Sequence, residues 1–196
     1  MVRPALSTLL KHARACQVCA PHLPLGARPI LQADARARIL VAGQAPGRRV
    51  HETGIPFNDV SGDRLRTWLG IERDTFYDAS KIALLPMGFC YPGSGASGDL
   101  PPRPECAPLW REQLLQRLPN IALTLVIGQY AMAWHLGDRR QANLTATVAA
   151  WRSFWPEVLP MPHPSPRNQR WMRNNPWFEA DVLPALQRRV QELIGR

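Results

Sequence analysis

Long apolar runs are missing from this chain of 196 residues. No window approaches the eighteen uninterrupted apolar residues of a membrane-spanning helix, so we expect no membrane span. Internal repeats, low-complexity segments and a secretory signal are not evident either, and we expect a cytoplasmic protein whose thiols stay reduced. With 45% hydrophobic residues the chain can bury one sizeable core, and nothing demands a second domain. We therefore predict a single domain, 1–196.

Acidic residues and lysines are scarce. Fifteen Asp and Glu stand against 24 Lys and Arg, which leaves a net charge of +9, and Lys11 and Lys81 are the only lysines. Such a balance favours an anionic partner, with nucleic acid the leading candidate. Charge alone does not decide the matter, because an arginine-rich, lysine-poor composition is also typical of a GC-rich genome.

Short apolar runs alternate with amphipathic stretches along the chain. Runs at 38–42, 81–86, 123–127 and 155–161 predict strands, and the 3.6-residue spacing of apolar residues predicts helices at 5–15, 63–69, 108–117 and 181–194, with another after Gly128. Alternation of this kind favours an α/β fold, a three-layer α/β/α sandwich around a central, mainly parallel four-stranded sheet. Ligands of such sheets bind at the carboxyl ends of the strands.

Two glycine- and proline-rich segments follow predicted strands. The first is Gly-Gln-Ala-Pro-Gly at 43–47, and the second is His-Pro-Ser-Pro-Arg-Asn at 163–168. Glycine tolerates backbone angles that other residues avoid, and proline fixes its own, so each segment turns sharply and can bring backbone amides close to a flat ligand. We expect the two segments to form one site.

These segments also carry a resemblance to a known family. Together with Thr-Gly-Ile-Pro-Phe at 53–57, the first resembles motif 1 of the uracil-DNA glycosylase superfamily, and His-Pro-Ser-Pro at 163–166 resembles its motif 2. The resemblance runs from the N-terminal cysteines to about Trp177. It implies an enzyme of base excision repair that binds DNA containing a damaged base, flips out uracil or another deaminated base and hydrolyses its N-glycosidic bond. We expect a monomer.

The four cysteines resemble those of the family 4, iron–sulfur type of these enzymes. Cys16 and Cys19 form a close pair, while Cys90 and Cys106 are separated by fifteen residues. Such thiols can hold a cubane cluster or one tetrahedral ion. The resemblance implies a [4Fe-4S] cluster; zinc comes second and four unrelated thiols third.

The superfamily motifs also assign the parts of a base pocket. By resemblance, Phe57 stacks on the flipped base, and Gly43, Gln44 and Ala45 present backbone amides to its carbonyl edge. His163 donates to the oxyanion that develops on the departing base. A core position for Phe57 and a structural position for His163 are the alternatives.

Two departures from family 4 affect the reaction. Gln44 stands where the family usually has Glu, and 83–88 lacks the Asn with which the family reads uracil. We predict that Glu52 and Asp59 supply the missing carboxylate and that Asn58 contacts the base, with surface solvation or helix capping as the alternative for the acids. Hydrolysis is expected rather than a lyase step, since no lysine lies near either motif.

A basic segment follows the second motif. Ser165 is expected to contact a phosphate, Arg167 occupies the place of the superfamily's wedge leucine, and Arg170 extends the basic surface toward the DNA backbone. A solvated basic loop is the alternative.

Two other functions stay open for the whole chain: a catalytically degenerate module that binds damaged or single-stranded DNA, and a hydrolase of free nucleosides or nucleotides.

Overall fold

A computed structural model describes residues 4–96 and 98–195. Its main sheet has four parallel strands in the order β2 (Ile82–Leu84), β1 (Ile39–Ala42), β5 (Leu123–Ile127) and β6 (Val158–Met161). The register places Leu40 between Ala83 and Thr124. The parallel sheet confirms the predicted fold class, and each strand lies within its predicted range.

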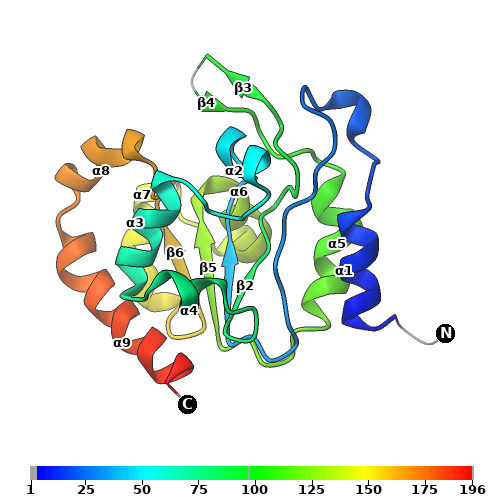
Figure 1. Cartoon of the computed structure of the whole chain (residues 1–196). Helices are drawn as coiled ribbons and strands as arrows, with labels where there is room; N and C mark the ends of the chain where they lie inside the picture. Colours follow the sequence, from blue (N-terminus) through cyan, green and yellow to red (C-terminus); the bar gives the residue numbers. More distant parts are fainter. Residues whose placement is uncertain (1–3, 97, 196) are drawn as a thin grey trace.

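Helices cover both faces of the sheet (Figure 1). On one face α1 (Leu6–Arg14) and α5 (Cys106–Leu115) bury Leu9 and Leu114 against Leu40. The other core includes residues of α3 (Val60–Leu69) and α9 (Leu183–Ile194), with Leu65 and Leu186 near Ile39. Neighbouring residues of β1 therefore enter different cores, because side chains alternate along a strand.

Several shorter elements complete the described residues. They are α2 (Arg48–Thr53), α4 (Arg73–Tyr77), α6 (Gly128–Leu136), α7 (Leu144–Ala149), α8 (Gln169–Asn174), the antiparallel strands β3 (Ser94–Gly95) and β4 (Gly98–Asp99), 3-10 turns at Ala20–His22, Gly137–Arg139, Trp151–Ser153 and Pro166–Asn168, and a π-helical turn at Phe178–Val182. The β3–β4 hairpin lies in a stretch without predicted secondary structure. It stands above the carboxyl ends of the sheet in Figure 1.

Two predicted helix boundaries need correction. The helix predicted at 63–69 begins at Val60, because the Asp59 carboxylate accepts a hydrogen bond from the Gly62 amide at 2.9 Å and caps the first turn. The helix predicted at 108–117 begins at Cys106 and ends at Leu115.

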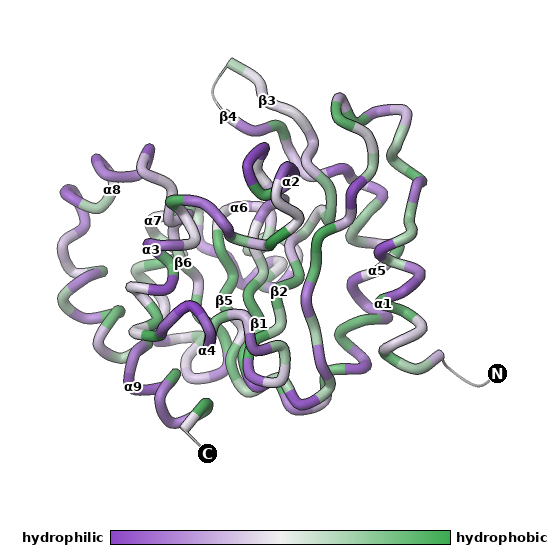
Figure 2. The backbone as a smooth tube through the Cα atoms, in the orientation of Figure 1, coloured by the Kyte–Doolittle hydropathy of each residue, from purple (hydrophilic) through white to green (hydrophobic). Residues whose placement is uncertain are grey.

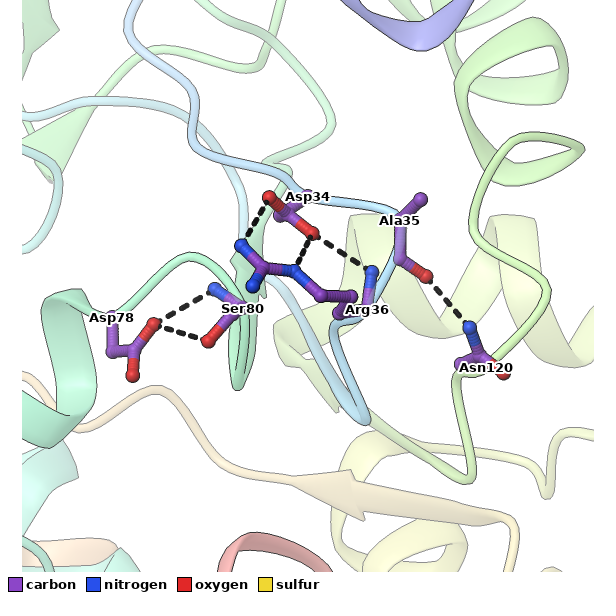
Figure 3. A network of polar contacts seen from close by, with 6 residues as sticks. All are labelled: Asp34, Ala35, Arg36, Asp78, Ser80 and Asn120. Atoms are coloured by element: carbon purple, nitrogen blue, oxygen red, sulfur yellow. Dashed lines mark hydrogen bonds and ion pairs between the residues drawn. The ribbon is translucent and has the colours of Figure 1, made fainter.

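The two ends of the sheet are built differently. At the amino ends, Figure 3 shows Arg36 paired with Asp34, Asp78 accepting from Ser80, and Asn120 donating to the Ala35 carbonyl. The Asn120 contact joins the loops that enter β5 and β1, while the other two contacts stay within the loops that enter β1 and β2. At the carboxyl ends, the chain leaves β1 toward β2 on one side and later returns to β5 on the other, which makes the topological switch point where ligands of such sheets bind.

Hydropathy follows these layers. Figure 2 shows apolar residues concentrated in the central strands and polar residues along the outer helices. Among residues 4–96 and 98–195, no helix combines the length and apolar character needed to cross a bilayer.

Candidate active site at the carboxyl ends of the strands

The first motif is fastened to the chain that follows β2. The Gly43 carbonyl accepts a hydrogen bond from the Met87 amide at 2.8 Å, and the Gln44 carbonyl accepts one from the Gly88 amide at 2.9 Å. The ladder between β1 and β2 thus continues beyond the strands. This pairing fixes the turn at the point where it leaves the sheet.

A cavity of about 240 Å³ opens beside this turn. Residues from both motifs and from the β3–β4 hairpin line it: Ile30, Gly43, Gln44, Ala45, Pro46, Gly47, Val50, Pro56, Phe57, Asp59, Ser61, Pro86, Asp99, His163, Ser165 and Arg167. The fold therefore brings the two glycine- and proline-rich segments to one pocket, as the sequence predicts. Its volume suits a small flat molecule.

Phe57 holds an unusual backbone conformation at the wall of this pocket. Its φ is 54°, in the left-handed region that bulky residues rarely adopt. Its carbonyl lies so close to Gly62 that a Cβ there would overlap it, and the Tyr77 hydroxyl donates to the neighbouring Pro56 carbonyl at 2.8 Å. The half-buried Phe57 ring packs edge-on against Phe76 with ring centroids 6.0 Å apart. Strain maintained by surrounding contacts is characteristic of positioned residues at functional sites.

His163 is oriented by its own loop. The Ser165 amide donates to Nδ1 of His163 at 3.2 Å, and the Asn168 side chain donates to the His163 carbonyl at 2.7 Å. Because Nδ1 accepts, the proton of the neutral ring is on Nε2. Burial lowers the pKa of His163, while the nearby Asp59 and Asp99 carboxylates oppose that shift. The imidazole is a neutral donor at neutral pH.

Two carboxylates contribute to the pocket. Asp59 does so while its Oδ1 atom caps α3. Asp99 comes from β4 and was missed by the sequence reasoning, since nothing in a stretch without strand periodicity indicates that its residues reach the pocket. Asp59 therefore lies where a catalytic carboxylate could act, and one of its oxygens caps the helix. Its catalytic role stays a prediction.

Gln44 uses its side chain to hold the hairpin. Its Nε2 atom donates to the Leu100 carbonyl at 2.9 Å and approaches the Asp99 carbonyl at 3.4 Å. An ionised glutamate at this position could not make these contacts, since a carboxylate has no proton to donate. The residue that departs from the family 4 pattern therefore has a contact of its own.

Three predicted site residues do not line the cavity. Glu52 is exposed on α2 and pairs with Arg48, with Nε and Oε1 3.0 Å apart. Asn58 accepts from Arg73 at 3.0 Å, and Arg170 is exposed on α8. Their predicted contacts with substrate stay predictions, and among the predicted acids Asp59 is the one at the pocket.

Arg64 and Arg167 lie beside the second motif at one side of the pocket, and we call this side the basic rim. Ser165 accepts from the Arg167 amide through its hydroxyl at 3.2 Å, and its carbonyl accepts from Arg64 at 3.2 Å. The Arg167 guanidinium lies against Gly98, where a Cβ would meet it. The second motif and the hairpin thus face each other across the opening, with arginine between them.

All four cysteines line a second, small cavity. They are Cys16 and Cys19 after α1, Cys90 after β2 and Cys106 at the start of α5. The Phe89 amide donates to Cys106 Sγ at 3.3 Å. Burial raises the pKa of the Cys90 thiol to about 11 and that of Cys106 to about 12, so an ion or cluster would have to displace their protons on binding.

Four thiols are a donor set that both iron–sulfur clusters and zinc use. Within the described residues, no three His, Cys, Asp or Glu side chains lie close enough together to hold a single metal ion. A cubane cluster separates its four thiolates more widely than one ion does, because each thiolate binds a different iron. The predicted [4Fe-4S] cluster and its zinc alternative therefore both stay predictions.

The sequence and the fold were compared with those of known proteins. Residues 31–187, well over half of the chain, match the model of the family described as the uracil DNA glycosylase superfamily. A solution NMR structure described as "a putative Uracil DNA glycosylase from Methanosarcina acetivorans" is 18% identical, with a TM-score of 0.46, over 82% of this chain and 98% of that chain. The match over 31–187 takes in both pocket-forming motifs, and the chain belongs to the uracil DNA glycosylase superfamily.

Proposed function

We propose that this protein is a DNA glycosylase that removes uracil or another deaminated base from DNA by hydrolysis of the N-glycosidic bond. The observation that carries the proposal is the single pocket in which the two motif segments place Phe57, the 43–47 turn and His163 together. Superfamily membership supports the same class of reaction.

The pocket offers the contacts that base excision needs. A base rotated out of the helix would stack on Phe57, with the backbone of Gln44 and Ala45 at its edge. His163 donates from Nε2 to the carbonyl oxygen on which negative charge develops as the glycosidic bond breaks. Because the ring is neutral before the reaction, it stabilises the leaving base as a hydrogen-bond donor and keeps its proton.

Water completes the reaction. Asp59 lies at the pocket and can orient a water molecule or stabilise positive charge on the sugar. A Schiff base needs a lysine amine, and the residues that line the pocket include no lysine. The products are the free base and an abasic site.

DNA would approach over the basic rim. Ser165 and Arg167 line the pocket, and Arg170 follows on the exposed α8. Arginine pairs with phosphate and also stacks through its planar guanidinium, so Arg167 suits the gap that a flipped base leaves. Phosphate contacts of this kind position the duplex without reading its sequence.

We further propose that Cys16, Cys19, Cys90 and Cys106 hold a [4Fe-4S] cluster, with zinc as the alternative. Such a cluster would link the end of α1, the chain after β2 and the start of α5, and so contribute folding free energy. The cysteine cavity and the base pocket share no lining residue, which makes the cluster structural in this account.

One observation favours a second candidate, a degenerate module that binds damaged DNA. Gln44 cannot act as a general base, and its side chain is engaged with the hairpin. Such a module would retain DNA binding and release no base. A hydrolase of free nucleosides would instead act without DNA and show little salt dependence.

A substrate comparison separates these functions. The protein is incubated with single- and double-stranded oligonucleotides carrying uracil, hypoxanthine or xanthine, and with the matching free nucleosides and nucleotides. The proposal predicts that base is released from at least one oligonucleotide and not from nucleosides. Release from nucleosides alone would identify the small-molecule hydrolase, and binding without release would identify the module.

A further inference from the structure

The β3–β4 hairpin carries a carboxylate to the base pocket. Asp99 pairs with Ser94 across the hairpin, and the Ser94 hydroxyl donates to Asp99 Oδ1 at 2.9 Å. The Tyr91 hydroxyl lies 2.8 Å from the same Ser94 oxygen. A short chain of hydroxyl groups, starting from a buried tyrosine, therefore fixes the direction of the Asp99 side chain.

Both motifs contact the hairpin. Gln44 of the first motif donates its side-chain amide to the Leu100 carbonyl at 2.9 Å, directly after Asp99. Arg167 of the second motif lies against Gly98, directly before Asp99. Asp99 is thus held between a contact from each half of the site.

Two carboxylates converge on Gly47. A Cβ built on Gly47 would lie 3.3 Å from Asp99 Oδ2 and 3.9 Å from Asp59 Oδ2. For each acid the other oxygen accepts a hydrogen bond, from Ser94 for Asp99 and from the Gly62 amide for Asp59. The two Oδ2 atoms therefore approach the same small space beside the pocket wall, which a side chain at position 47 would occupy.

We propose that Asp99 is a catalytic residue of this site, that it acts with Asp59 on the sugar side of the scissile bond, and that Gln44 positions it by anchoring the hairpin. This inference rests on the proposed glycosylase function. It explains why an amide stands where the family usually has an acid: the carboxylate comes from the hairpin, and the amide holds the hairpin in place.

The bond between C1′ and the base nitrogen breaks, and its electron pair leaves with the base, whose oxyanion accepts a hydrogen bond from His163 Nε2. The two carboxylates stabilise the positive charge on the sugar. A water oxygen then bonds to C1′, and its proton passes to the Asp99 carboxylate and on to solvent. The departing base anion takes a proton from solvent.

The binding of a cationic sugar analogue tests whether Asp99 stabilises positive charge on the sugar, and this test does not depend on base release. Binding is measured for oligonucleotides whose abasic residue is either a pyrrolidine, which is cationic, or tetrahydrofuran, which is neutral. We expect wild-type protein to prefer the pyrrolidine, and Asp99→Asn to reduce that preference about fivefold, because Asp99 is exposed and a charge pair about 4 Å apart gains about that factor at the dielectric constant of water. Asp138→Asn, an exposed acid after α6, should leave the preference unchanged.

Position 44 provides a second test. If Gln44 were merely a lost family acid, Gln44→Glu would raise base release. We expect the reverse, a fall of about tenfold, because a carboxylate cannot donate to the Leu100 carbonyl and would repel it. Asp99→Asn should lower the single-turnover rate about 10²-fold while tetrahydrofuran binding is kept.

The outcomes separate this proposal from the proposed function. If wild-type protein releases no base from any oligonucleotide, the glycosylase proposal fails, and the pyrrolidine comparison still shows whether Asp99 faces a sugar cation. If wild-type protein releases base and Asp99→Asn is as fast, with an unchanged pyrrolidine preference, the assignment of Asp99 is wrong. An increased rate for Gln44→Glu would contradict the proposal that Gln44 positions Asp99 by anchoring the hairpin.

Discussion

His163 shows how one short loop can set the chemistry of a side chain. The Ser165 amide occupies Nδ1, and burial keeps the ring neutral, so Nε2 keeps its proton and can donate. The two nearby carboxylates would favour the charged ring, but burial is the larger influence on its pKa. The preferred state of the residue is therefore a neutral donor.

The pH dependence of base release follows from that state. Because the pKa of His163 is below its usual value of 6.5, its imidazole stays neutral as the pH falls through 6.5. We expect single-turnover rates, measured from pH 8 downward, to show no inflection near 6.5. A fall in rate centred there and absent from His163→Gln would contradict this account of His163.

Two glycines near the pocket differ in the space around them. Gly62 leaves no room for a Cβ beside the Phe57 carbonyl, whereas Gly47 has extended backbone and only ordinary or slightly tight neighbours. We expect Gly62→Ala to lower the free energy of unfolding by about 1–3 kcal/mol, the usual cost of overpacking, and Gly47→Ala to change it by less than about 0.5 kcal/mol.

Urea denaturation of the two alanine variants measures this difference. Gly47→Ala is the matched control, because both changes add one methyl group to the same part of the chain. Equal stabilities would contradict the close contact between Gly62 and Phe57, and with it the argument that the Phe57 backbone is held in place.

At the scale of elements, a buried arginine joins α5 and α6 to the end of β2. Arg111 is fully buried, donates to the Leu85 and Pro86 carbonyls at 2.6 and 3.0 Å, and lies 2.6 Å from His135 Nε2. Pro86 lines the base pocket. Arg111 thus supports the pocket wall by binding the two carbonyls that directly follow β2.

This contact predicts acid sensitivity. Burial and the adjacent Arg111 lower the pKa of His135 from 6.5 to about 3. Between those values the unfolded chain binds a proton at His135 and the native chain does not, so the free energy of unfolding should fall as the pH drops from about 6.5 to about 3.

The measurement is urea denaturation across that pH range. His135→Gln should show a shallower fall than wild type, and His12→Gln, a change at an exposed histidine on α1, should follow wild type. If His135→Gln and wild type lose stability in parallel, His135 is not the group responsible.

The strands that build the site could be predicted from sequence, and the hairpin could not. The apolar run at 123–127 marks β5 because a central parallel strand is buried on both faces, and the turn at 43–47 follows from its glycines and proline. Ser94–Asp99 has neither an apolar run nor alternation. It is placed by Gln44 and Arg167, which are distant in sequence, and Asp99 could therefore be found only in the fold.

The same limit applies to Glu52 and Asp59. Both follow the first motif, and sequence reasoning could not rank them. The difference arises from local structure, since Asp59 lies at the N-cap of α3 facing the pocket while Glu52 lies on the exposed side of α2.

For the whole molecule, the net charge of +9 and the basic rim predict salt-sensitive DNA binding. Each phosphate contact contributes about 0.7–0.9 to the slope of log affinity against log salt, so Arg170→Ala should reduce the slope by about that amount. Arg188→Ala, an exposed position on α9, should leave it unchanged. Equal slopes for Arg170→Ala and wild type would show that Arg170 on α8 makes no phosphate contact.

The cysteines predict a linkage between metal content and stability. Protein purified without oxygen should contain about four iron atoms per chain, and Cys90→Ser should lower both the iron content and the Tm, because the ligands join three separate segments. One zinc per chain, without iron, would support the alternative. Full stability of Cys90→Ser with neither metal would reject a structural metal site.

We propose that one pocket, built from two distant motifs, breaks the bond between a deaminated base and its sugar. The most direct test is the single-turnover yield of free base and abasic sites from the oligonucleotide panel, for wild type, His163→Ala and the control Asp138→Asn. The account predicts equal amounts of both products with wild type and the control, and a loss of at least about 10²-fold with His163→Ala. Base release that survives His163→Ala unchanged, or none from wild type with any substrate, would contradict it.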